Sequence, residues 1–238
     1  MSDRSISQKP SDKARLKVLK TVSLREQIYD HLRERIRTGQ LTFDDRLVDV
    51  DIAHEFGVSR MPVREALMQL VHDGAIESTT RGFMLRRYSD QEIADIFEIR
   101  RLLEPAAAEI AAGKMTESAL QIMEAAIQAG IAASEANDFT AFVVANAAFR
   151  EAWMAQVPNK QLVAALARYF DHVQIIRLVT LSQRPVRDDV LGRLHEIHDA
   201  FRAGDASRVA ALFRDHVDAA VLAYRTYSKD QTYSKDMR

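Results

Sequence analysis

Two arginines four residues apart, Arg60 and Arg64, have the residue type and spacing in this sequence best suited to bind an anion. Side chains at a spacing of four lie on one face of a helix. A guanidinium group carries its donors in a rigid fork that matches phosphate oxygens and the base edges of duplex DNA. The pair is therefore a candidate nucleic-acid contact. The alternative interpretation is a solvated helix surface without a partner.

The residues around this pair predict two short helices joined by a glycine turn. The first helix ends at Phe56, and Gly57 turns the chain. Ser59 is a suitable N-cap for the second helix, and Pro62 is tolerated because first-turn amides have no partner within a helix. Apolar residues then recur at helical spacing up to Gly74. This is a helix-turn-helix pattern, in which the second helix enters the DNA major groove by its N-terminal end.

A hairpin is predicted directly after Gly74. Residues 75–78 and 83–86 have the composition of two short strands around a turn at 79–82. Arg81 at the tip can enter the adjacent minor groove or contact phosphate, and Gly82 permits close backbone approach. Before the motif, residues 23–38 predict an amphipathic helix, because apolar residues step by four along it.

The segment from Val58 to Leu67, followed by Gly74 and by Thr80-Arg81-Gly82-Phe83, closely resembles the winged helix-turn-helix of GntR-type bacterial transcription regulators. The resemblance runs from about Leu24 to Arg86. It implies DNA contacts at matching positions, which are Ser59, Arg60, Arg64, Arg81 and Gly82. Met61 stands among them where the family usually has threonine or a small polar residue. Val50 stands where one branch has a contacting arginine, so the operator sequence stays open.

Length and composition indicate two mainly helical domains. The chain has 238 residues, 47% of them hydrophobic, with 8 glycines, 5 prolines and no cysteine. No apolar run has the length of a membrane span, and no apolar targeting segment is present, so we expect a cytoplasmic protein. The net charge is −1, but residues 1–87 carry 16 Lys and Arg against 13 Asp and Glu. DNA contact should therefore depend on a few placed arginines and a basic tail.

The expected fold class is mainly α, with an N-terminal winged helix-turn-helix followed by an all-helical antiparallel bundle. We expect a disordered basic tail at 1–20, a DNA-binding domain at 21–87, a helical effector-binding and dimerisation domain at 92–227, and a flexible tail at 228–238. The predicted helices of the second domain are 91–112, 117–135, 139–157, 160–182, 188–203 and 206–227, with Pro185 in a loop.

The segment Glu98 to Ala108 resembles the start of the FCD effector domain of FadR-like GntR regulators, over about residues 92–225. In many members, an Asp and three His bind a divalent metal ion, and a carboxylate effector completes the coordination of that metal. Here Asn146 stands at the Asp position, Arg150 at the first His and Leu194 at the second, and only His216 remains. We therefore expect no metal and no cofactor.

Arg150 is instead the expected positive centre, because a guanidinium can hold a carboxylate in a bidentate fork. Arg100, Asn146, Arg177 and His216 would assist it. Each of these residues also has an ordinary structural interpretation, such as a surface charge, a core amide or an interhelical ion pair. His195 and His198 lie three apart and could form an alternative metal site with His216.

The sequence thus predicts a transcription regulator, expected to be a repressor, that binds double-stranded DNA at a pseudo-palindromic operator as a homodimer. Its ligand would be a small organic acid, and no membrane partner is expected. A second hypothesis is a ligand-independent regulator whose helical domain only dimerises. An enzyme is disfavoured, because no nucleophile–base pair, phosphate loop or zinc-protease motif is visible.

Overall fold

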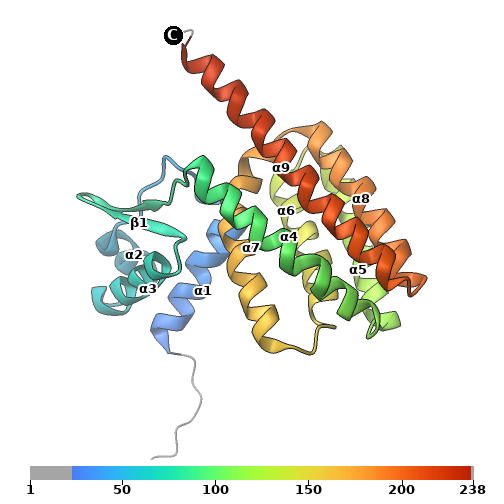
Figure 1. Cartoon of the computed structure of the whole chain (residues 1–238). Coiled ribbons are helices and arrows are strands. Elements are labelled where there is room, and N and C mark those ends of the chain that lie inside the picture. The colour runs from blue at the N-terminus through green and yellow to red at the C-terminus, as the bar shows by residue number, and fades with distance from the viewer. Residues whose placement is uncertain (1–22, 237–238) are drawn as a thin grey trace, which may run out of the picture.

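A computed structural model describes residues 23–236, except the side chains of residues 171, 174, 175, 178, 179 and 227–236. Two units lie side by side (Figure 1). The winged unit contains three helices and a hairpin: α1 (Leu24–Arg37), α2 (Asp49–Phe56), α3 (Arg60–His72), β1 (Ile76–Thr79) and β2 (Gly82–Leu85). The predicted basic tail at 1–20 lies outside the described residues.

The winged unit forms because local signals begin its helices and one apolar core joins them. Ser23 caps α1 in a capping box with Glu26. Gly57 ends α2 with a φ of 65°, the left-handed conformation that glycine adopts without strain. Ser59 is the N-cap residue of α3, as predicted, but its side chain makes no capping hydrogen bond. The buried core residues include Ile28, Leu32 and Ile36 of α1 and Val63, Ala66, Leu67 and Leu70 of α3.

The hairpin is anchored by the connector that precedes α2. Its strands are displaced by one residue from the predicted limits, and Thr79 pairs with Gly82 at the turn. Leu47 and Phe83 exchange two backbone hydrogen bonds of 2.8 Å, which adds a bridge to the edge of β2. Gly82 has a φ of 122°, and a Cβ on it would lie 2.6 Å from the carbonyl oxygen of Leu47. Gly82 is thus required for backbone packing within the protein.

The helical unit consists of α4 (Asp90–Ala112), α5 (Glu117–Glu135), α6 (Phe139–Met154), α7 (Lys160–Thr180), α8 (Arg184–Arg202) and α9 (Ala206–Asp236). Side chains of Ser89, Thr116, Asp138 and Asn159 accept hydrogen bonds from the first turns of α4 to α7. The mainly α fold class with its winged N-terminal part is confirmed. Within residues 23–236, no helix combines the length and apolarity needed to cross a bilayer.

Two expectations for the helical unit are wrong. Pro185 was expected in a loop, but it occupies the first turn of α8, which begins at Arg184 rather than at residue 188. Proline fits there because its missing N–H would have no helical partner. α9 was expected to end near Tyr227, before a flexible tail at 228–238, but its backbone continues as helix to Asp236. Residues 237–238 lie outside the described residues. The repeated Thr-Tyr-Ser-Lys-Asp segment contains no proline or glycine that would end it.

We predict that Gly82→Ala destabilises the protein by about 1–3 kcal/mol, because an alanine there combines a strained φ with a clash against the Leu47 carbonyl. Urea unfolding measures the change. Gly192→Ala is the matched control: a Cβ there meets nothing within 4 Å on the helix α8. The control should be neutral or stabilising. Equal stabilities of wild type and Gly82→Ala would contradict the close approach of hairpin and connector.

Candidate nucleic-acid interface and interior cavity

The predicted DNA-contact residues lie on the open surface of the winged unit. Arg64 and Met61 are exposed on the N-terminal half of α3, and Met61 keeps 66% of its surface accessible. Arg81 is exposed in the turn between β1 and β2. Helix start and hairpin tip are thus available for a groove and for the phosphates beside it.

Arg60 is exposed but already has an acidic partner. Its Nη2 lies 3.0 and 3.2 Å from the two carboxylate oxygens of Asp49, the first residue of α2. This ion pair holds the starts of α2 and α3 together across the turn. A phosphate would have to compete with Asp49 for Arg60, whereas no ion pair of Arg64 occurs among the described residues. Arg64 is therefore the better candidate for reading a base.

All five predicted effector residues line one cavity inside the helical unit. Arg100 comes from α4, Asn146 and Arg150 from α6, Arg177 from α7 and His216 from α9. Leu194, at the second His position of the family pattern, lines the same cavity. Apart from Glu104, the remaining lining residues are apolar: Phe149, Trp153, Phe170, Ile197 and Phe213. Residues far apart in the chain thus converge on one partly polar interior.

Each cation in this cavity meets a compensating group. Arg100 forms an ion pair with Glu104 one turn along α4, and the two side chains are each only 2% exposed. The Arg150 guanidinium lies over the Phe170 ring, 4.6 Å from its centroid. Arg177 donates from Nη2 to Oδ1 of Asn146 at 2.5 Å. Sequence reasoning missed Glu104 and Phe170 as site residues. Only Glu104 had a usable signal, its spacing of four from Arg100.

The electrostatics of the cavity favour an anion. Burial, with repulsion from Arg150 and Arg100, lowers the pKa of Arg177 to about 9, which still leaves it cationic at pH 7. Burial is also the main cause that lowers the pKa of His216 to about 3, with Arg177 and Arg100 adding to it. His216 is therefore neutral. Among the described residues, no hydrogen-bond partner reaches Arg100 Nη1, Asn146 Nδ2 or His216 Nδ1.

The cavity is small in this conformation. Its volume is about 20 Å³, and a neighbouring cavity of about 40 Å³ shares Arg100, Arg177 and His216 as its wall. Such volumes hold one or two waters rather than an organic acid. A ligand of that size would have to displace side chains.

The alternative histidine site is not assembled. The Nε2 atom of His198 lies 3.1 Å from the carbonyl oxygen of Leu120, and its Nδ1 lies 3.4 Å from Glu124 on α5. These contacts turn His198 toward α5, whereas His216 lines the cavity. Within residues 23–236, no three His, Cys, Asp or Glu side chains are grouped to hold a metal ion.

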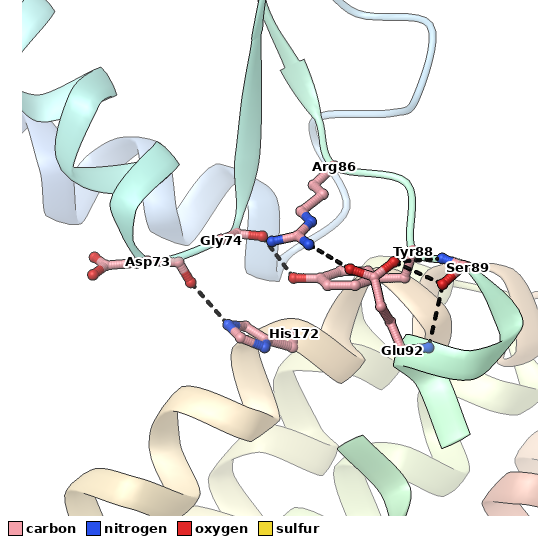
Figure 2. Close-up of polar contacts among 7 residues, drawn as sticks. All are labelled: Asp73, Gly74, Arg86, Tyr88, Ser89, Glu92 and His172. Carbon is pink, nitrogen blue, oxygen red and sulfur yellow. Dashed lines mark hydrogen bonds and ion pairs between the residues drawn. The ribbon is translucent and has the colours of Figure 1, made fainter. Parts of the chain in front are cut away.

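A second polar site, not predicted from the sequence, joins the two units (Figure 2). The Tyr88 hydroxyl donates to the carbonyl oxygen of Gly74 at 2.6 Å, and His172 Nε2 lies 2.8 Å from the carbonyl oxygen of Asp73. Since a carbonyl only accepts, this nitrogen carries the proton. Arg86 lies over the Tyr88 ring at 4.9 Å and contacts Glu92 at 2.5 Å. Tyr88 and His172 therefore bind the backbone just after α3.

A winged helix-turn-helix with exposed arginines, joined to a helical unit with a cationic cavity, defines a DNA-binding regulator. Residues 24–82 match the family described as "Bacterial regulatory proteins, gntR family", and residues 95–219 match the FCD domain. The chain belongs to the GntR family of bacterial regulators, in the group with an FCD domain. It is a transcription regulator and not an enzyme.

Relatives and solved structures agree with this assignment. An uncharacterised HTH-type transcriptional regulator of Mycobacterium tuberculosis is 28% identical, over 84% of this chain and 82% of its own length. A probable D-xylose utilization operon transcriptional repressor of Paenarthrobacter nicotinovorans is 27% identical, over 85% and 89%. The structure of E. coli McbR/YncC superposes with a TM-score of 0.77 at 21% identity, covering 87% of this chain and all of that one. This last likeness concerns the fold alone.

We predict that His216 makes the protein less stable as the pH falls below about 6.5. The unfolded chain binds a proton at this histidine near pH 6.5, but the folded chain does so only near pH 3, so stability is lost as the pH falls through this window. Between pH 7 and pH 5 the loss is about 2 kcal/mol. Urea unfolding at both pH values should show a smaller loss in His216→Gln. Equal losses in both proteins would mean that His216 titrates normally when folded.

Proposed function

We propose that this chain is a sequence-specific repressor that binds a pseudo-palindromic operator as a homodimer and responds to a small carboxylate held in the helical cavity. The observation that carries the proposal is the separation of two cationic sites. Exposed arginines stand on α3 and on the hairpin tip, and buried arginines line the interior of the second unit. One set suits a polyanion, and the other suits a single small anion.

DNA would be read by the N-terminal half of α3. Ser59, Arg60, Met61 and Arg64 lie at or near its first turn, the part that contacts base edges in helix-turn-helix proteins. Arg81 and Gly82 at the hairpin would contact the minor groove or the phosphates beside it. Met61 offers an apolar surface to a base, a contact that suits a thymine methyl group. A probable repressor among the relatives supports the proposal that this protein represses transcription. Such a protein would act in the cytoplasm.

The homodimer would place two copies of α3 one DNA turn apart. α4 and α9 pack against each other, and each carries a large apolar side chain on the outside of the bundle. Leu102 keeps 68% and Leu222 67% of its surface exposed. Leu102 thus lies on the outer face of α4. Its exposure, next to the Arg101–Asp218 ion pair between the two helices, makes this side a candidate contact between copies.

A second candidate function is favoured by the small volume of the cavity. With about 20 Å³, this cavity has no room for an organic acid as it stands, which would suit a domain that only dimerises. Against this, three arginines in one interior are costly to bury, and two uncharged lining atoms, Asn146 Nδ2 and His216 Nδ1, have no hydrogen-bond partner among the described residues. A dimerisation core gains nothing from such groups. A ligand site uses them.

We predict that Arg64→Ala weakens binding to an operator fragment by about 1–3 kcal/mol if Arg64 reads a base, and that selectivity over unrelated DNA falls with it. Fluorescence anisotropy with a fragment from the upstream region of the gene measures both. The control is Arg202→Ala, which removes an exposed arginine from the end of α8 in the helical unit. An operator affinity unchanged by Arg64→Ala would contradict the proposed reading of DNA by α3.

We predict that at least one small acid from a panel of acetate, lactate, succinate and malate raises the melting temperature by several degrees. Binding to the folded state stabilises it by about 2.7 kcal/mol when the acid is present at 100 times its Kd. Arg150→Met should abolish the rise, because the guanidinium fork is lost.

Arg202→Met is the matched control, since Arg202 is exposed at the end of α8 and contacts Glu124 outside the cavity. It should respond to the acid as the wild type does. If no acid in the panel raises the melting temperature, the ligand-independent regulator becomes the better assignment.

A further inference from the structure

The helix α7 has two opposite faces that serve the two units. Leu166, Phe170, Val173 and Arg177 recur at helical spacing, and they face the bundle core and its cavities. Ala164, Arg168 and His172 recur every four residues on the other side. Two of them line the hollow beside the winged unit, and His172 contacts the residue after α3. A displacement of α7 therefore changes both surfaces at once.

On the cavity side, α7 is held by one short polar contact. Arg177 donates to Asn146 on α6 at 2.5 Å, within the cavity that the proposed ligand would enter. A carboxylate that accepts the Arg177 Nη2 hydrogen now shared with Asn146 would displace the Asn146 oxygen from it. Ligand binding would thus loosen or replace the link between α6 and α7.

On the other side, α7 and the linker hold the C-terminal end of the recognition helix. α3 ends at His72, and the next two carbonyls, of Asp73 and Gly74, accept from His172 and Tyr88 (Figure 2). These donors come from the helical unit and the linker, and they satisfy groups that helix ends leave without partners. Gly74 has a φ of 77°, and a Cβ on it would lie 3.3 Å from His172 Nε2 and 3.5 Å from the Tyr88 hydroxyl. The contact is close and specific.

The rest of the junction is loosely filled. A hollow of about 400 Å³ separates α1 and the end of α3 from α7, with Tyr29, Arg33, Gln69, Asp73 and Arg168 among its lining residues. Beyond it, Arg37 of α1 forms an ion pair of 2.6 Å with Glu151 of α6, so polar contacts more than packed apolar side chains resist a rotation of the winged unit. Tyr88 is an exception, because its ring packs against the cores of both units, and burial raises its pKa to about 12, so its hydroxyl stays a donor.

We propose that His172 and Tyr88 are positioning residues that set the orientation of the recognition helix, and that α7 transmits the state of the Asn146–Arg177 contact to them. The inference rests on the proposed function for its purpose, because orientation decides whether two copies of α3 fit one operator. The coupling is reciprocal, so operator DNA and cavity ligand change each other's affinity by the same factor.

The test uses the absence of cysteine, which lets two spin labels be introduced without background. Asp44→Cys and Glu135→Cys place labels on exposed positions of the winged and helical units. Labelled chains are diluted with unlabelled protein, so that distances within one chain dominate. We expect one narrow distance distribution in the otherwise unchanged protein. Adding Tyr88→Phe and His172→Ala together should broaden and displace it.

The matched control is Tyr224→Phe. It removes a tyrosine hydroxyl that bonds Asp90 at 2.9 Å within the helical unit and that is not part of the contact with Asp73 and Gly74. Its distance distribution should equal that of the unchanged protein. An unchanged distribution in the folded Tyr88→Phe/His172→Ala protein would overturn the positioning role. Circular dichroism verifies that each variant is folded. If the double variant does not fold, the single variant His172→Gln takes its place in the distance measurement.

A double-mutant cycle on operator affinity tests the transmission through α7. Asn146→Ala releases Arg177, and His172→Ala releases Asp73. The contacts of Arg177 and His172 lie on opposite faces of α7. If the two contacts act independently, the effects of the two substitutions on operator affinity should multiply. We expect the operator affinity of the Asn146→Ala/His172→Ala protein to differ by about fivefold or more from the product of the two separate effects. In the control cycle, the effects of Asn146→Ala and Tyr224→Phe on operator affinity should multiply. A multiplicative result in both cycles would refute the transmission. If the wild-type protein binds no operator DNA, the proposed function is wrong. The distances between the spin labels would still test whether His172 and Tyr88 position the winged unit.

Discussion

Positive charge buried in a small interior is the constraint on which the structure of the helical unit depends. A guanidinium removed from water must find an anion, an aromatic face or a hydrogen-bond acceptor, or it destabilises the fold. α4 supplies Glu104 for its own Arg100, α7 supplies the Phe170 ring for Arg150, and α6 supplies Asn146 for Arg177. The cavity therefore links three helices. Burial is the main cause that keeps His216 neutral, and repulsion from Arg177, Arg100 and Arg193 adds to it.

Where metal-containing members of the family have a divalent ion, this cavity offers guanidinium groups instead. In the proposed site, this exchange would change how an anion is held. A metal is bound by fixed ligands and attracts an anion as a compact charge, whereas arginines must be kept apart and oriented by their neighbours. Asn146 and Phe170 perform that orientation here. Because those neighbours stand on α6 and α7, the size and shape of the site depend on how these two helices pack.

Different interactions stabilise the two units. The winged unit is built from short elements. Local caps begin α1 and end α2, whereas the carbonyls after α3 accept from Tyr88 and His172, and Leu47 pairs with Phe83 beside the hairpin. The helical unit has the larger apolar core, centred on Trp153, Phe201 and Phe213. Between them lies a junction of a few polar contacts and a hollow. Interfaces of this kind allow relative motion of domains, whereas motion within either core would break close packing.

Most helix limits could be predicted, because a helix start is decided within one turn. Ser89 and Asn159 accept hydrogen bonds from amides two or three residues away, and Gly57 ends α2 by its own conformation. Errors arose where two local signals conflicted. Pro185 is a loop signal and also a suitable first-turn residue, and nothing within reach of Tyr227 in the chain decides whether α9 continues. The hairpin limits were displaced by one residue because Thr79 and Gly82 pair with each other, so only two residues remain in the turn.

By itself, the sequence determined the family, the winged fold, and the set of residues that meet in the cavity, since spacing along helices and a motif register carry that information. Only the tertiary structure decided what those residues touch. The stacking of Arg150 on Phe170, the turn of His198 toward α5, and the attachment of Tyr88 and His172 to the end of α3 all join distant segments. Contacts of that kind depend on how helices pack in three dimensions, and a pattern of spacings within one helix contains no record of its neighbours.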